Sequence, residues 1–272
     1  MGRTLLVSVI LYAACGGAST GTMHHAAPEV AATELAAASL GLMPGEAMAF
    51  EVRMAGVLAG EAALAVGQPG LVDGRRAITV RSRIASAGAV ALVKHFVDEA
   101  TTVLDMDTAR PVSMTADMAI DSNAYHAELG FDGGRVDVTY QKKGAAKPVH
   151  QRYDFGNSTC HDAHSAMAAV RTWQSEPGAS RTLWVMGGRR AWRADVTFVG
   201  GETLGTSVGN RAALRLQGTA YRLRSDRTVD AARTPRTFTV WISDDGDRVP
   251  LRVVANTELG DVVIELVDYQ RP

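Results

Sequence analysis

The stretch TFTVWI at residues 237–242 shows the pattern that decides the fold. Its even-numbered residues, Phe, Val and Ile, occupy every second position, which is the period of a β-strand that turns one face toward a core. Residues 112–120 and 192–198 alternate in the same way. Strands with one buried face and one face toward water or a second layer are typical of antiparallel sheets.

Glycine-containing turn signals separate these strand-like runs. Glycine adopts the positive φ that tight hairpin turns require. The signals are Asp73-Gly74, Asp132-Gly133-Gly134, Gly187-Gly188, Asp245-Gly246 and Gly260-Asp261. They predict successive hairpins, and therefore an all-β protein built as an antiparallel up-and-down meander. Because a sheet of about 12 to 14 strands curls or closes rather than staying flat, we expect a curved sheet, a half-barrel or a barrel.

One segment, 162–173, breaks this pattern and predicts an amphipathic helix. Asp162 can cap its start, and its apolar stripe must be buried because so short a helix is marginal in water. We expect Met167 and Val170 to pack against the sheet, and His161 and His164 to stay at least partly exposed. A second apolar run, 87–97, fits one or two helical turns.

The first 14 residues have the form of a signal peptide. Arg3 supplies a positive charge, and the apolar run that follows is too short to span a bilayer as a helix. The run ends AACG at residues 13–16, which resembles the lipobox of bacterial lipoproteins, where the cysteine becomes the lipidated N-terminus. The resemblance implies a lipid anchor at Cys15 and, since Gly16 rather than Asp follows, the outer membrane.

The alternatives for this N-terminus are a plain signal peptide cleaved near Ala18 and an uncleaved anchor. We expect residues 15–43, rich in Ala, Thr and Gly, to form the lipidated N-terminus and a tether. Residues 44–272 are expected to form a single β-rich domain, since all-β folds of this length often remain one unit. Two adjacent histidines in the tether, His24 and His25, bind metals weakly and give no metal site.

Composition narrows the range of partners. The chain has 272 residues and a formal net charge of −1, and 46% of its residues are hydrophobic and 21% charged. This is an ordinary globular balance, and without a basic excess nothing favours a nucleic acid as partner. Of the two cysteines, Cys160 is left alone if Cys15 is lipidated, so no internal disulfide is expected in the domain.

The densest cluster of reactive residue types is the run CHDAH at 160–164. The candidate catalytic or metal-binding residues are Cys160, His161, Asp162 and His164. They could supply a nucleophile with its base, or metal ligands, but no second cluster supplies further ligands and Arg171 on the same helix face discourages a cation. The interpretation we favour is a helix N-terminus with a capping Asp and solvent-facing histidines, with no catalytic residue, metal or cofactor.

Two further patterns have plain structural interpretations. The DDGD run at 244–247 lacks the spaced ligands of a calcium loop, so we expect a polar turn. Arginines recur at alternating positions of several strands, as at Arg81 and Arg83 or at Arg222 and Arg224. Such a face could bind anionic ligands, but we expect these arginines to pair with Asp and Glu on a solvated sheet face.

Several segments together resemble a known family of exported bacterial proteins. The matching segments are Gly45-Glu46, Ala59-Gly60, residues 162–171, Gly201-Glu202 and residues 238–252. They resemble domain-of-unknown-function family number 3108, and the resemblance spans residues 44 to 269. It implies an exported protein with a β-rich fold but transfers no catalytic residue, because the family has no assigned activity. The chain departs from the family pattern at His164 and Ala169, where larger apolar or aromatic residues are usual.

These observations favour a non-enzymatic lipoprotein of the cell envelope, at the outer membrane and facing the periplasm. Its curved sheet would bind or support a lipid, a glycan or a protein partner. The alternative is an envelope hydrolase or other enzyme that uses the Cys160–His164 region, and a structural module without a ligand is the third hypothesis. An apolar cavity would favour ligand binding, and a base beside Cys160 would favour the enzyme.

The N-terminal pattern generates a direct test. Mass spectrometry of the protein isolated from its native membrane should find an N-terminal Cys15 carrying acyl chains. A free N-terminus at Ser19 would instead show cleavage of a plain signal peptide.

Overall fold

The computed structural model describes residues 40–207, 209–257 and 260–272. The signal peptide, Cys15 and the tether up to residue 39 lie outside the described residues and stay predictions. Among the helices of the described part, none has the length and apolar character needed to cross a membrane. Leu40 and Leu42, at the start of this part, are 1% and 2% exposed, so the hydrophobic core already includes side chains that precede Pro44.

A single sheet contains the strands, and nearly all neighbours in it are antiparallel. The strands are β1 (Ala47–Met54), β2 (Val57–Val66), β3 (Gly70–Val72), β4 (Arg75–Ser86), β5 (Phe96–Asp105), β6 (Pro111–Ile120), β7 (Asn123–Asp132), β8 (Arg135–Lys142), β9 (Val149–Asp154), β10 (Cys160–Asp162), β11 (Ser180–Gly187), β12 (Arg190–Thr206), β13 (Gly209–Arg222), β14 (Arg236–Ser243), β15 (Pro250–Thr257) and β16 (Gly260–Gln270). Their hydrogen-bonded order is β10-β11-β12-β13-β14-β15-β16-β1-β2-β4-β5-β6-β7-β8-β9, with β3 beside β4. Consecutive strands are therefore neighbours almost throughout, and the predicted meander is confirmed.

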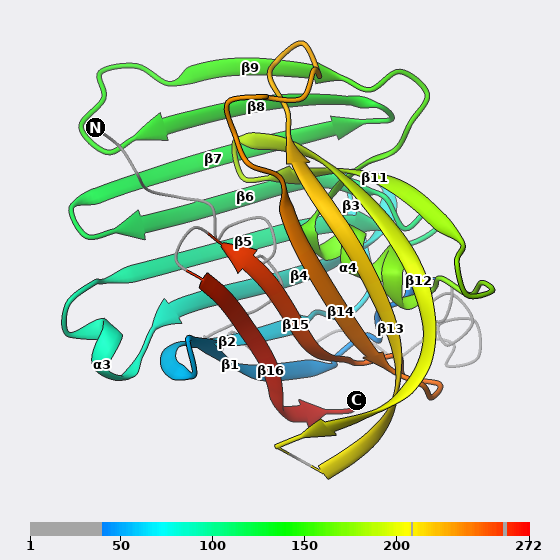
Figure 1. Cartoon of the computed structure of the whole chain (residues 1–272). Helices are drawn as coiled ribbons and strands as arrows, with labels where there is room; N and C mark the ends of the chain where they lie inside the picture. Colours follow the sequence, from blue (N-terminus) through cyan, green and yellow to red (C-terminus); the bar gives the residue numbers. More distant parts are fainter. Residues whose placement is uncertain (1–39, 208, 258–259) are drawn as a thin grey trace.

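The sheet is strongly curved into two leaves. Figure 1 shows β4–β9 at the back and β11–β16 in front, with β1 and β2 joining them along the lower side. Tight hairpins permit this arrangement. Between β3 and β4, for example, both turn residues have positive φ, 51° at Asp73 and 76° at Gly74, which is the backbone geometry that matches the twist of the strands it joins.

The curved sheet does not close into a barrel. Its strand order runs from β10 to β9, and no backbone pairing joins these two edges within the described residues. Aromatic rings meet there instead. Phe155, which follows β9, lies 5.4 Å from Trp184 of β11 between ring centres, and Tyr153 stacks on Phe155 at 6.3 Å. We call this contact the aromatic seam. The expected curved, barrel-like sheet is therefore confirmed, and it is open.

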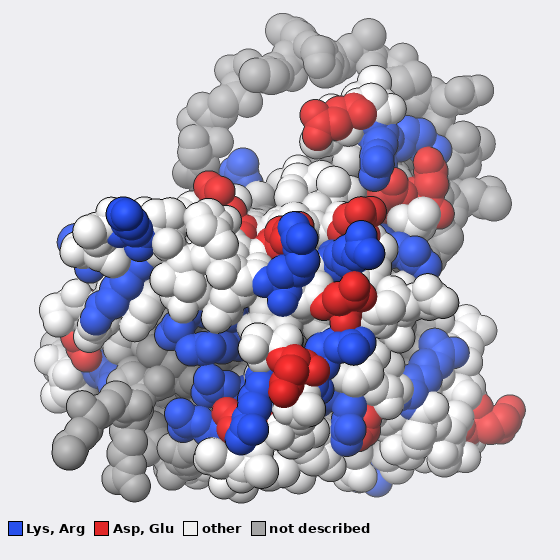
Figure 2. Space-filling model, turned by 90° about the horizontal axis from the view of Figure 1, so that it is seen from above, with Lys and Arg blue, Asp and Glu red and all other residues white. Residues whose placement is uncertain are grey.

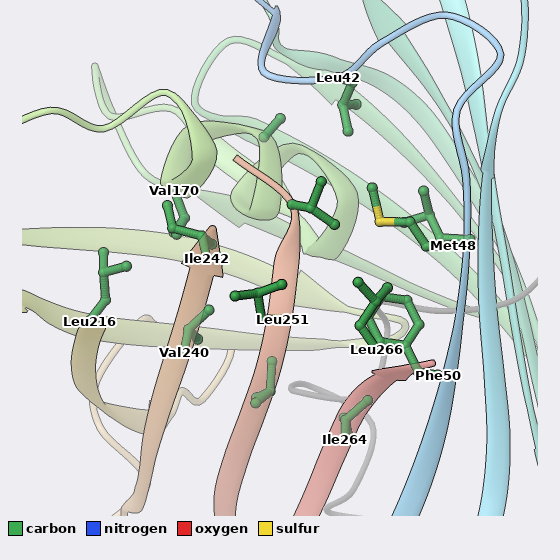
Figure 3. Packing of buried hydrophobic residues seen from close by; sticks show 14 of the residues in the cluster. Leu42, Met48, Phe50, Val170, Leu216, Val240, Ile242, Leu251, Ile264 and Leu266 are labelled. Atoms are coloured by element: carbon green, nitrogen blue, oxygen red, sulfur yellow. The ribbon is translucent and has the colours of Figure 1, made fainter. Parts of the chain in front are cut away.

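Two clusters of buried side chains fill the inner face of the sheet. The larger lies mainly between β12–β16 and β1–β4. Figure 3 shows part of it, including Leu42, Met48, Phe50, Val170, Leu216, Val240, Ile242, Leu251, Ile264 and Leu266. The smaller cluster joins β5–β9 to β10–β12 beside the aromatic seam. Burial from both leaves explains why the alternating apolar residues of so many strands are needed.

Two short helices interrupt the strands, and both were expected. α3 (Gly88–Ala91) is a single turn between β4 and β5. α4 (Ala163–Arg171) lies between the two leaves (Figure 1). Asp162 caps α4 as predicted, accepting hydrogen bonds from the backbone N–H groups of His164 and Ser165 at 3.2 and 3.1 Å.

The polar face of α4 is also buried, so the expectation that His164 would stay partly exposed is wrong. His164 is 1% exposed and Ser165 0%, whereas Met167 of the apolar stripe is only partly buried. The reason is that both leaves cover the helix, and a helix covered on two sides must satisfy its polar groups inside the protein. His161 remains partly exposed, as expected.

A buried ion pair fixes the end of α4. The guanidinium of Arg171 donates to both carboxylate oxygens of Glu46, at 2.6 and 2.9 Å, and to the carbonyl oxygen of Asp247 at 2.8 Å. The side chains of Arg171 and Glu46 are 2% and 0% exposed. Glu46 also accepts from the backbone N–H of Met43 at 3.0 Å. The pair thus joins the helix to the chain just before β1 and to the β14–β15 connection.

Breaking this pair from one side should be costly. Arg171→Met leaves the Glu46 carboxylate buried without its partner, so we expect a loss of about 3–5 kcal/mol in the free energy of unfolding. Replacing both partners, as Arg171→Met with Glu46→Leu, removes the uncompensated charge and should recover most of that loss. Urea unfolding measures both variants, and equal losses in the single and double variants would contradict the argument.

Candidate functional site

The structure places all four candidate residues at the junction of β10 and α4, and His161, the one that is partly exposed, lies with its Nδ1 3.2 Å from Ser165 Oγ. Cys160 and Asp162 lie on β10, which pairs in parallel with β11, and His164 is in the first turn of α4. Cys160, Asp162 and His164 are each 1% exposed or less. The predicted cluster therefore exists in space, but it lies inside the protein and not on a surface that a substrate can reach.

Cys160 has none of the surroundings of a nucleophile. Its thiol makes one weak contact, to the carbonyl oxygen of His161 at 3.8 Å. Burial raises the pKa of the Cys160 thiol, and the nearby negative charge of Asp162 raises it further. Since the thiolate is the reactive form, a thiol held protonated in an apolar site is inert.

Asp162, in contrast, has a complete set of partners. Thr102 of β5 donates its hydroxyl to Asp162 Oδ2 at 2.5 Å, and the hydroxyl of Ser165 donates to Oδ1 at 2.6 Å. Burial acts to raise the pKa of Asp162, but hydrogen bonds and charge from His164, with those from Ser165 and Thr102, outweigh burial and leave this pKa lowered. Asp162 is therefore an ionised structural group.

His164 completes this network from the other side. Its Nδ1 lies 2.8 Å from the hydroxyl oxygen of Thr102. Because that hydroxyl donates its proton to Asp162, the imidazole Nδ1–H must be the donor to Thr102. The order Asp162–Thr102–His164 places the hydroxyl between acid and imidazole, whereas a nucleophilic triad needs the imidazole in the middle. Thr102 was not singled out in the sequence, where it is one of many inward-facing strand residues.

Metal binding finds no support in the described part of the chain. No group of three His, Cys, Asp or Glu residues there is placed to hold an ion. The DDGD run forms the expected polar turn, in which Asp245 Oδ1 accepts from the hydroxyl of Ser243 at 2.7 Å and from two backbone N–H groups at 3.1 Å.

A second titratable group lies on the outer face of the back leaf. His126 of β7 contacts the carboxylates of Asp117 at 2.8 Å and Glu128 at 3.3 Å. The hydrogen bond to Asp117 is the largest effect on His126, and the net result is a raised pKa. His126 and Asp117 border an open hollow of about 390 Å³ with Glu99 and Lys143, but none of the polar residues that line it is buried.

The arginines divide into two groups. On the outer faces several of them pair with acids, as expected, whereas Arg81 forms no ion pair in the described part of the chain. The pairs include Arg83–Glu99 at 2.9 Å, Arg193–Asp195 at 2.9 Å, Arg215–Glu202 at 3.3 Å and Arg252–Glu265 at 2.6 Å. At the upper end of the molecule in Figure 1 a different arrangement occurs. We call it the arginine–tyrosine end. Its members are Arg189, Arg190, Arg222, Arg224 and Arg233, with Tyr125, Tyr140 and Tyr153.

The turn between β11 and β12 carries this group from one leaf to the other. The guanidinium carbon of Arg189 lies 4.7 Å from the ring centre of Tyr125 and 5.1 Å from that of Tyr140. These tyrosines belong to β7 and β8 of the back leaf, whereas Arg190 begins β12 of the front leaf. Seen from above, Lys and Arg side chains run across the middle of this face, with Asp and Glu side chains between some of them (Figure 2).

Charge at this end is poorly balanced. Burial lowers the pKa of Arg190, and the neighbouring Arg189 and Arg222 lower it further. Burial likewise lowers the pKa of Arg222, followed by repulsion from Arg233. The nearest carboxylate, Asp230, lies 3.8 Å from Arg222 Nε, too far for a hydrogen bond. Arg222 Nε is buried and has no hydrogen-bond partner within the described residues.

Comparisons with known proteins agree with this fold. The family model described as "Protein of unknown function (DUF3108)" matches residues 49–267. The crystal structure of a β-barrel-like protein of domain of unknown function DUF1849 from Brucella abortus has a TM-score of 0.56 at 7% identity, covering 84% of this chain and 97% of that one. No curated protein matches the chain.

Two further solved structures show weaker similarity. One is provisionally described as an exported protein with a YmcC-like fold, from Bacteroides fragilis, with a TM-score of 0.36 at 9% identity over 84% of this chain and 97% of that one. The other, provisionally described as a lipoprotein from Parabacteroides distasonis, has a TM-score of 0.35 at 8% identity over 84% and 96%.

The buried thiol gives a chemical test. In the folded protein Cys160 should react with iodoacetamide at pH 8 at least about 100-fold more slowly than in urea, because the thiol is protonated and inaccessible. Peptide mapping by mass spectrometry reports the labelling at this residue. Rapid labelling in the folded state would restore the hypothesis of a thiol enzyme.

The lowered pKa of Asp162 predicts a pH dependence. Its folded pKa lies below the ordinary value of 3.8, so its stabilising contribution is present above that value and is lost as the pH falls through the folded pKa. Asp162→Asn should therefore lower the free energy of unfolding by about 1–3 kcal/mol at pH 7. The difference from the natural protein should shrink at pH 3, as urea unfolding can measure, and a difference that grows in acid would contradict the assignment.

Proposed function

Because the chain belongs to the DUF3108 family, whose description assigns no activity, we infer its role from its own residues. We propose that it is a non-enzymatic lipoprotein of the bacterial cell envelope that binds an envelope component at its arginine–tyrosine end. In this proposal Cys15 anchors the protein to the outer membrane, and the β domain faces the periplasm. The component is a lipid, a glycan or an envelope protein.

The observation that carries the proposal is the unbalanced charge of this end. Arg189, Arg190 and Arg233 form no ion pair with any acid in the described residues, whereas several outer-face arginines of the same sheet do. Arginines held close together without acids repel one another, and such an arrangement is unfavourable unless a ligand supplies the negative charge. A rigid sheet that presents these groups is suited to binding.

The enzymatic alternative rests on the Cys160–His164 region, in which Asp162 and His164 form structural hydrogen bonds inside the protein. Cys160 is buried, and no base within the described residues forms a hydrogen bond with its thiol. The carboxylate of Asp162 accepts hydrogen bonds from the helix N-terminus and from Thr102. A substrate would need to displace the core to reach either group. These contacts support a binding protein over an envelope hydrolase that uses this region.

The packing of the inner face of the sheet also supports a ligand site at the arginine–tyrosine end. A lipid bound on the concave face of the sheet would need an apolar cavity there. The two hydrophobic clusters and α4 occupy that face, with side chains such as Leu251, Ile242 and Met186 fully buried. An interior packed in this way favours a ligand that binds at the arginine–tyrosine end.

The proposal is tested by binding of the full-length protein in an uncharged detergent to three envelope components. These are lipopolysaccharide, soluble peptidoglycan fragments and vesicles of phosphatidylglycerol. We expect one of them to bind, and the double variant Arg189→Gln with Arg190→Gln to weaken that binding at least about tenfold. Arg83→Gln, which removes an arginine paired with Glu99 on the outer face, is the matched control and should bind as the natural protein does.

Two results would count against the proposal. One is the absence of binding to all three components. The other is an equal loss of binding in the control and in the double variant, which would place the ligand elsewhere on the molecule.

A further inference from the structure

We propose that the arginine–tyrosine end recognises a phosphate group, carried by a phosphomonoester of the envelope. This inference rests on the binding role proposed above and names the chemistry of its ligand. It is argued from three features of the site: the number of charges, the burial of the guanidinium groups and their fixed orientation.

The first feature is the number of like charges. Five arginines meet the carboxylates of Asp230 and Asp226 at this end, and Asp226 is close enough to Arg224 for their charges to interact. Asp230 lies between Arg222 and Arg224, at 3.8 and 3.6 Å from their Nε atoms, and so is shared by both. A ligand that balances this end must bring more than one negative charge. A phosphomonoester carries about 1.5 to 2 negative charges and three acceptor oxygens at neutral pH, whereas a carboxylate carries one charge and two oxygens.

The second feature is partial burial. Arg190 and Arg222 are both partly buried, and Arg222 Nε lacks a hydrogen-bond partner in the described residues. A buried donor without a partner is unfavourable, and repulsion between charges is stronger where water is partly excluded. Both effects disappear when an oxyanion accepts hydrogen bonds from these guanidinium groups. The free protein is therefore expected to be less stable than the same protein with its arginines neutralised.

The third feature is orientation. Arg189 lies over the rings of two tyrosines on the opposite leaf, which holds its planar guanidinium in place before a ligand arrives. Arginine presents a fixed fork of N–H donors that matches phosphate oxygens in pairs, and its preorganisation reduces the entropy lost on binding. Tyr153 is buried beside the same arginines, and burial raises its pKa, so its hydroxyl stays neutral and adds no competing negative charge.

The experiment is thermal unfolding of the full-length protein in an uncharged detergent, with inorganic phosphate compared with chloride at equal ionic strength. Phosphate should raise the melting temperature in a saturable way. Arg190→Gln should melt above the natural protein in chloride, because one repelling charge is gone. The same variant should need at least about tenfold more phosphate for half of the effect. Arg83→Gln is the control and should respond to phosphate as the natural protein does.

Two further arms distinguish the source of the phosphate. Binding to vesicles that contain phosphatidic acid, a lipid phosphomonoester, would identify a lipid headgroup if inorganic phosphate displaces it. Stabilisation by glucose 6-phosphate without vesicle binding would identify a soluble phosphate ester. Either result supports the inference.

The inference is overturned if phosphate gives no saturable response, or if Arg190→Gln responds as the natural protein does. Failure of this inference is separable from failure of the proposed function. If an envelope component binds through Arg189 and Arg190 while phosphate has no effect, the phosphate assignment is wrong and the binding role stands. If phosphate stabilises the natural protein but no envelope component binds, the anion site stands and the proposed role is wrong.

Discussion

The buried ion pair between Arg171 and Glu46 is the constraint on which the rest of the structure depends. It holds the end of α4 against the chain that enters β1 and, through the carbonyl of Asp247, against the front leaf. With the helix held there, the two leaves cannot collapse onto each other, and the inner face is filled by helix and side chains together. The start of the same helix is bonded to β5 through Thr102, so α4 joins both leaves at once.

Much of the fold could be predicted from the sequence because its signals are local. Alternation along the strands, glycine turns and the capping Asp162 each depend on residues within one short segment, and the meander follows from hairpins between neighbours. The burial of His164 could not be predicted, since it depends on a second leaf that covers the polar side of the helix. The contact between Thr102 and Asp162 joins residues 60 positions apart, and no pattern in the sequence connects them.

The candidate site shows the same limit in a different way. The run at 160–164 is dense in reactive residue types because a buried helix start needs polar partners, and it serves structure more than chemistry. Arg189 and Arg190, in contrast, simply follow the turn signal Gly187-Gly188 in the sequence. Only the fold places them beside Tyr125 and Tyr140 of the other leaf and beside Arg222. The binding site that we propose therefore rests on the surroundings of each charge in the folded protein, which no local pattern in the sequence shows.

The aromatic seam has a mechanical consequence. Backbone hydrogen bonds fix the spacing of neighbouring strands within a few tenths of an ångström, but rings in contact at 5.4 Å between Phe155 and Trp184 have no such directional requirement. The curved sheet therefore resists deformation where its strands are hydrogen-bonded and yields more easily at the aromatic seam. Opening the sheet at the aromatic seam would separate aromatic side chains but would break no backbone hydrogen bonds between paired strands. The loop that contains Asp226 and Arg227 borders the aromatic seam. The seam therefore lies close to the arginine–tyrosine end.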